Sequence, residues 1–97
     1  MPSVTRIGDM DMFHCSLPHR LMGSQDVFAN KRGVSRQSDV NDPHLLPGGL
    51  TCPVHAAPIT MGSKSVFANK LGVGRIGDQV TACTAVAEGS QDVFAGD

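Results

Sequence analysis

The chain has no tryptophan or tyrosine and four phenylalanines, while glycine occurs eleven times and proline six times. So few large apolar side chains build a thin core, and burial of that core barely offsets the conformational entropy lost on folding. Small domains of this kind commonly contain a staple such as a disulfide or a metal ion. We therefore expect a single domain over residues 1–97, held together by an additional staple.

Long apolar and long basic runs are also missing. No stretch approaches the roughly 20 apolar residues that span a bilayer, and the N-terminus lacks the basic and apolar segments of a secretory signal. Eight basic and nine acidic residues give a net charge of −1. No Lys or Arg cluster would follow a phosphate backbone, so we expect no nucleic-acid binding.

Three cysteines are present, Cys15, Cys52 and Cys83. An odd number argues against a closed disulfide framework and leaves thiolates available for metal. The expected staple is therefore a metal ion.

The sequence contains an internal repeat. Residues 23–36 and 62–75 are identical at ten of fourteen positions, and a truncated third copy covers 89–97. A second repeat, Arg-x-x-Asp, begins at Arg6, Arg36 and Arg75. The chain thus begins within one unit and ends within another, and we expect these two halves to meet and close a structure of pseudo-threefold symmetry.

Each unit predicts a β-hairpin. The β-prone Val-Phe-Ala is followed by Asn-Lys-x-Gly, and we expect Asn30 and Gly33, with Asn69 and Gly72 in the next copy, to adopt the left-handed conformations of a tight turn. The Pro- and Gly-rich residues 39–61 exclude a long helix and predict an irregular loop. The expected fold class is all-β with much irregular structure.

The positions five residues beyond each repeated aspartate are occupied by metal-ligand types, namely His14, His44 and Cys83. If the units surround a threefold axis, these side chains converge and form three corners of a tetrahedral zinc site. The fourth ligand is Cys52 or His55, which flank Pro53-Val54. Four protein ligands leave no open coordination position, so the ion is structural; zinc suits mixed N/S donors best, and iron could replace it.

Several other residues receive a structural interpretation. Cys15 and His19 have no counterpart in the repeat and are not expected to bind metal. The recurring Arg-x-x-Asp is expected to tie a strand end to the next turn, whereas Asp9 and Asp11 are expected to be solvated carboxylates. Cys83 with a nearby histidine could suggest a catalytic nucleophile, but no oxyanion loop accompanies it in the sequence. A chain this small also leaves little room for a substrate pocket, so we expect no catalytic residues and no enzyme activity.

The units Gly-Ser-x-x-Val-Phe-Ala-Asn-Lys-x-Gly-Val-x-Arg, continued by Arg-Ile-Gly-Asp and by Cys-Pro-x-His, resemble the PAAR-repeat family over nearly the entire chain. The namesake tetrapeptide is reduced to Gly-Val-Ser-Arg and Gly-Val-Gly-Arg, and Ser38 replaces an expected glycine. The resemblance implies a small pseudo-threefold cone with zinc near its vertex, held by three histidines and one cysteine. It therefore favours His55 over Cys52, which gives the set His14, His44, His55 and Cys83.

The resemblance also implies a function. The cone would cap the trimeric β-helical spike of a contractile phage tail, one copy per trimer, placing the protein at the tail tip of a virion in transient contact with the target membrane. A trimeric β-helix ends in exposed backbone edges, and a pseudo-threefold monomer can cover all three chains at once. The alternatives are the tip of a bacterial type VI secretion spike, loaded in the cytoplasm, and a free-standing zinc-binding adaptor. The residues that contact the partner are not indicated.

Overall fold

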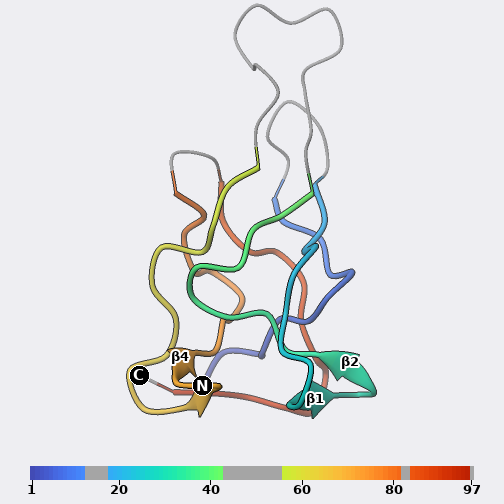
Figure 1. Cartoon of the computed structure of the whole chain (residues 1–97), viewed down its shortest axis with the longest axis vertical. Helices are drawn as coiled ribbons and strands as arrows, with labels where there is room; N and C mark the ends of the chain where they lie inside the picture. Colours follow the sequence, from blue (N-terminus) through green and yellow to red (C-terminus); the bar gives the residue numbers. More distant parts are fainter. Residues whose placement is uncertain (13–17, 43–55, 82–83, 97) are drawn as a thin grey trace, which may run out of the picture.

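The computed structural model describes residues 1–12, 18–42, 56–81 and 84–96. Within these ranges the regular structure consists of two antiparallel hairpins, β1 (Phe28–Ala29) with β2 (Arg32–Gly33) and β3 (Phe67–Ala68) with β4 (Leu71–Gly72) (Figure 1). The described residues contain no helix, so none of them forms a helix that could cross a membrane. The expected all-β class with much irregular structure is confirmed.

Both hairpins turn through an Asn-Lys pair. Asn30 and Lys31 have φ values of 55° and 70°, and Asn69 and Lys70 have 54° and 70°. Positive φ at both central residues is the conformation of a type I′ turn, which fits the twist of the flanking strands. The left-handed conformation expected of the asparagines is therefore confirmed.

The left-handed conformation predicted for Gly33 and Gly72 is wrong, because the second left-handed residue of each turn is the lysine. Gly33 and Gly72 lie in β2 and β4 instead. A Cβ at either position would lie 2.3 Å from a backbone oxygen, that of Ser24 or Ser63, so these glycines permit a close backbone approach.

The two ends of the chain build a third unit. Ser3 pairs with Phe94, and the Val4 amide donates to the Val93 oxygen at 2.9 Å. The same bond joins Val34 to Val27 at 3.0 Å and Val73 to Val66 at 3.1 Å. Both termini lie at the end of the molecule that holds the hairpins (Figure 1). The expected meeting of the two half-units is confirmed.

Backbone hydrogen bonds join the three units in a ring. Thr5 donates to Gly74 at 2.9 Å, Gly74 to Ser35 at 2.8 Å, and Ser35 back to Thr5 at 3.0 Å. All three residues are buried. A Cβ on Gly74 would lie 2.6 Å from the Ile59 Cδ1, so the Ile59 side chain would have to shift to admit a larger residue at this point of the ring. This closed circuit marks a pseudo-threefold axis.

A small apolar core surrounds this ring. It contains one valine and one alanine from each unit, and each is at most 3% exposed: Val4, Val34, Val73, Ala29, Ala68 and Ala95. The repeated sequence therefore encodes a repeated core in what we call the hairpin layer, residues 1–6, 23–36, 62–75 and 89–96.

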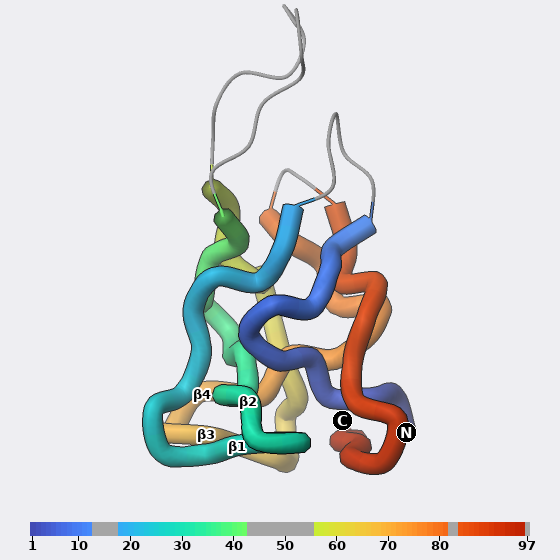
Figure 2. The backbone as a smooth tube through the Cα atoms, turned by 90° about the vertical axis from the view of Figure 1, so that its right-hand side faces the viewer, coloured from blue at the N-terminus to red at the C-terminus, as the bar shows by residue number. Residues whose placement is uncertain are grey.

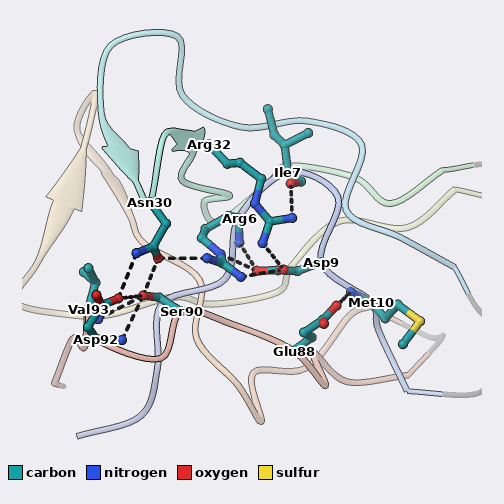
Figure 3. A network of polar contacts seen from close by, with 10 residues as sticks. All are labelled: Arg6, Ile7, Asp9, Met10, Asn30, Arg32, Glu88, Ser90, Asp92 and Val93. Atoms are coloured by element: carbon teal, nitrogen blue, oxygen red, sulfur yellow. Dashed lines mark hydrogen bonds and ion pairs between the residues drawn. The ribbon is translucent and has the colours of Figure 1, made fainter.

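The Arg-x-x-Asp repeat ties the units together. In each copy the arginine amide and guanidinium donate to the aspartate three residues later. The remaining guanidinium nitrogen reaches the neighbouring hairpin, from Arg6 to Asn30 at 2.8 Å, from Arg36 to Asn69 at 2.9 Å, and from Arg75 to the Gly96 oxygen at 2.9 Å. The expected structural role is confirmed, and it extends from one unit to the next (Figure 3).

The turn inside each Arg-x-x-Asp repeat has positive φ, 91° at Gly8, 78° at Ser38 and 93° at Gly77. Serine thus occupies a conformation that glycine adopts in the other two copies. A left-handed conformation costs an L-residue about 1–2 kcal/mol.

Beyond the hairpin layer, the six inward positions of the three units carry different residues: Asp11, Asn41, Val80, Arg20, Ile59 and Val86, each at most 2% exposed. The Arg20 Nη2 donates to the Asp11 Oδ2 at 2.8 Å, and both side chains are 0% exposed. The expectation that Asp9 and Asp11 are solvated is wrong, since these residues are 0% and 1% exposed. Each carboxylate is buried because an arginine pairs with it.

Candidate docking surface

The hairpin layer exposes apolar side chains at the same place in every unit. The exposed fraction is 38%, 41% and 38% for Val27, Val66 and Val93, and 57%, 56% and 46% for Phe28, Phe67 and Phe94. We call these six residues the Val-Phe ring. The alanine that follows each phenylalanine is buried in the core. Because successive side chains of a strand point to opposite faces, each phenylalanine is directed away from the core.

The Val-Phe ring is held by a backbone that repeats as closely as its side chains do. A serine at the start of each copy, Ser24, Ser63 or Ser90, accepts hydrogen bonds from two amides of the turn that leads to the valine. Such a local side-chain bond fixes a turn without help from a helix or a sheet. The three Val-Phe pairs therefore project from three equivalent turns.

Three grooves lie at the edge of the hairpin layer, one beside each hairpin copy, and two of them also contain an asparagine of the neighbouring copy. Each is lined by an arginine of the Arg-x-x-Asp repeat and by the glycine that opens a hairpin copy. The polar residues beside them differ: the three grooves contain Gln25 and Asp26, Lys64, and Gln91 and Asp92. The grooves are equivalent in backbone but not in charge.

Two of these grooves are spanned by an Asn-Asp hydrogen bond. The Asn30 Nδ2 donates to Asp92 at 2.8 Å (Figure 3). The Asn69 Nδ2 donates to Asp26, also at 2.8 Å. The hydrogen bond from Asn30, with another from Ser90, lowers the pKa of Asp92 below its usual value. For the third groove, the equivalent sequence positions carry Gly96 and Ser65, which cannot form an Asn-Asp hydrogen bond.

All candidate metal ligands, His14, His44, His55, Cys83 and the alternative Cys52, lie outside the described residues, as does Cys15. Within the described ranges, no three His, Cys, Asp or Glu side chains gather at a point where they could hold a metal ion. His19 lies 3.8 Å from Asp42, measured from Nδ1 to Oδ2.

The described segments that lead to the candidate ligands end together, opposite the hairpins (Figure 2). They are hydrogen-bonded to one another in a circuit. Thr84 Oγ1 donates to the Met12 oxygen at 3.1 Å, the Asp42 amide to His19 at 2.8 Å, and the Thr81 amide to Pro58 at 2.8 Å. The chain therefore enters and leaves each candidate ligand segment at the same end of the pseudo-threefold axis.

Sequence reasoning missed two features of these surfaces. The Val-Phe pair recurs in all three copies, and the repeat predicts a strand there without indicating that the side chains are exposed; the recurrence itself is the available signal. The buried pair of Asp11 and Arg20 gave no such signal, because Arg20 lies outside both repeats.

No protein-family model matches the chain, and no curated protein matches it significantly.

Proposed function

We propose that the protein is a structural tip that caps the trimeric β-helical cell-puncturing spike of a contractile phage tail and aids membrane penetration. The observation that carries this proposal is the Val-Phe ring, in which one chain presents the same exposed apolar pair three times around a pseudo-threefold axis. A monomer gains nothing in solubility from such a surface, whereas a threefold partner could contact all three pairs at once.

The end of such a spike requires a cap. The blunt end of a trimeric β-helix leaves backbone edges unpaired on three identical chains, and unpaired edges are prone to aggregation. One chain with three equivalent sectors covers the three edges with a single molecule. The resemblance to PAAR-repeat proteins also supports this assignment, because the cones of that family stand on such spikes.

The second part of the proposal is a structural metal near the vertex. His14, His44, His55 and Cys83 would hold zinc, or iron in its place, with Cys52 as the alternative to His55. The donor set fits a closed tetrahedral site, and the segments that carry it leave the described structure at one end of the axis. The ion would crosslink a vertex where too few apolar side chains are available to stabilise the chain. A rigid vertex concentrates the force of tail contraction on a small area of membrane.

Stoichiometry tests the docking proposal. The full chain is mixed with a trimeric β-helical spike fragment and examined by analytical ultracentrifugation, and we expect one chain per trimer. The matched control replaces all three phenylalanines by serine, Phe28→Ser, Phe67→Ser and Phe94→Ser, which should abolish the complex without unfolding the protein. A complex with three chains per trimer, or none with the parent chain, contradicts the proposal.

Elemental analysis tests the metal site. We expect about one equivalent of zinc or iron per chain, as for other structural sites with tight binding. The variant Cys83→Ser should lose the metal, whereas Cys15→Ser should retain it. Less than about half an equivalent in the parent protein contradicts the metal site.

The same spike-tip function in a bacterial type VI secretion apparatus uses the same docking surface. A free-standing zinc-binding adaptor, by contrast, would engage a soluble partner of one chain. That partner would contact the three Val-Phe pairs unequally. Equal contributions of the three pairs to binding therefore favour the spike tip, and unequal contributions favour the adaptor.

A further inference from the structure

The exact symmetry of a trimeric partner restricts which residues of the hairpin layer can contribute to docking. This step rests on the proposed function. Three identical chains present the same side chain to three equivalent positions of the cap. A position therefore contributes fully only where all three units carry the same residue.

The Val-Phe ring meets this condition. Its valines differ in exposure by no more than three percentage points, between 38% and 41%, and its phenylalanines lie between 46% and 57%. One apolar residue of the partner, repeated on its three chains, would find an equivalent contact in each sector. Buried aromatic side chains are also the residue type that dominates binding energy at interfaces.

The rim, by which we mean the two residues that follow Ser24, Ser63 and Ser90, does not meet this condition. The first of these positions carries Gln25, Lys64 and Gln91, and the second carries Asp26, Ser65 and Asp92. A cationic ring on the partner would be attracted by the two aspartates and repelled by the lysine; an anionic ring would meet the opposite pattern. Attraction in two sectors is thus offset in part by repulsion in the third, and the three rim pairs together carry a net charge of only −1, from two aspartates and one lysine.

The rim aspartates are also engaged within the cap. Asp26 and Asp92 accept hydrogen bonds from the amides of Asn69 and Asn30. A partner cation would have to compete with these bonds for exposed carboxylates, and exposed ion pairs contribute about 1 kcal/mol or less.

We propose that docking affinity resides in the three Val-Phe pairs, that the contact ring of the partner is apolar and uncharged, and that the rim contributes little electrostatic attraction. Binding is then insensitive to ionic strength, and each phenylalanine contributes equally. The three rotational settings of the cap on the spike are equivalent, since the partner looks the same in each.

Isothermal titration calorimetry with the full chain and a trimeric β-helical spike fragment tests this inference. Between about 50 and 500 mM NaCl, where the Debye length falls severalfold, we expect Kd to change by about threefold or less. Phe28→Ala, Phe67→Ala and Phe94→Ala should each weaken binding by about tenfold or more, as a loss of 1.4 kcal/mol or more implies. The three Kd values should agree within about threefold.

The matched control makes the rim symmetric. The pair Lys64→Gln and Ser65→Asp gives the second sector the rim residues of the other two, and it should leave Kd within about threefold of the parent. Melting temperatures of all variants should match the parent, because the substituted side chains are exposed.

A larger salt effect, unequal phenylalanine variants or a changed Kd in the rim variant overturns the inference. If the complex still contains one chain per trimer, the proposed function stands without it. Absence of any complex with the parent chain overturns both.

Discussion

We predict that the buried ion pair of Asp11 and Arg20 can be replaced by apolar residues without loss of stability, and the other two units indicate which residues fit. At the equivalent inward positions the other two units carry Asn41 with Ile59, and Val80 with Val86. The third unit is therefore apolar where the first is ionic. The test is the double substitution Asp11→Val and Arg20→Met. Valine is the residue of the third unit at this position, and unbranched methionine fills the space of the arginine stem.

The structure indicates the size of the effect. Asp11 Oδ1 and Arg20 Nε are buried without a hydrogen-bond partner among the described residues. Burial also raises the pKa of Asp11 above its usual value, although Arg20 and Asn41 oppose this shift. The burial penalty on the carboxylate thus outweighs the attraction of its partner. Replacing such a pair by apolar residues is neutral or stabilises a protein by about 1–4 kcal/mol.

Each single substitution should behave in the opposite way. Asp11→Val removes the acceptor of bonds from Arg20 and Asn41, at 2.8 and 3.0 Å, and leaves a buried guanidinium without a counter-charge. Breaking a buried pair in this manner costs about 3–5 kcal/mol. The double variant should recover at least about 3 kcal/mol relative to Asp11→Val.

Urea unfolding followed by far-UV circular dichroism measures these differences, since the chain lacks the tryptophan and tyrosine that fluorescence would need. The parent, both single variants and the double variant complete a mutant cycle. A double variant that is as unstable as Asp11→Val would refute the argument, because the polar pair would then be contributing net stability.

Three further predictions concern the turns, the titration of Asp11 and the closure of the ring. A Cβ at Gly77 would meet no atom within 4 Å, but φ is 93° there, so Gly77→Ala should lower the free energy of unfolding by about 1 kcal/mol through backbone strain. Ser38→Gly should leave the free energy of unfolding unchanged or raise it by up to about 1 kcal/mol. Equal unfolding free energies for Gly77→Ala and the parent would contradict this. Because the folded pKa of Asp11 is raised above 3.8, its contribution to stability is present below pH 3.8 and is lost as the pH rises through the folded pKa. The stability of the parent relative to the double variant should therefore decrease from acid to neutral pH, and a relative stability that increases over that range has the wrong sign. A circular permutant that joins Asp97 to Met1 by a short linker and opens between Asn30 and Lys31 should retain the circular dichroism spectrum of the parent, because the two ends already pair through Ser3 and Phe94; an unfolded permutant would show that the third unit needs free ends.

The repeated part of the fold could be predicted from the sequence because identical residues perform identical tasks in it. The valines that form the core and the Arg-x-x-Asp ties recur at the same offsets within all three units, and the Asn-Lys turn recurs in two of them, so a structure for one copy implies the others. The closure of the ring followed from the half-units at residues 1–6 and 89–97. Two details of it failed. Gly33 and Gly72 are not the left-handed residues of the turns, since spacing shows that a turn needs such residues but not which of four adopts them. Asp9 is buried with its arginine and not solvated.

The six inward positions beyond the hairpin layer could not be predicted, for a physical reason. Its six positions carry two charges, one amide and three apolar side chains, so the repeat disappears where the side chains meet. Asp11 resembles any exposed carboxylate in sequence, and its burial depends on an arginine nine residues away. The candidate docking surface was partly visible, because the Val-Phe pair recurs, but its exposure depends on the packing of the alanines beneath it.

An electron cryo-microscopy reconstruction of the chain bound to a trimeric β-helical spike, computed without imposed symmetry, tests the central claim most directly. We expect one molecule centred on the threefold axis of the spike, with Phe28, Phe67 and Phe94 each facing a different spike chain and the ends that lead to His14, His44 and Cys83 pointing away. A molecule bound off the axis, or one whose hairpin layer faces solvent, would contradict the proposed role as a spike tip.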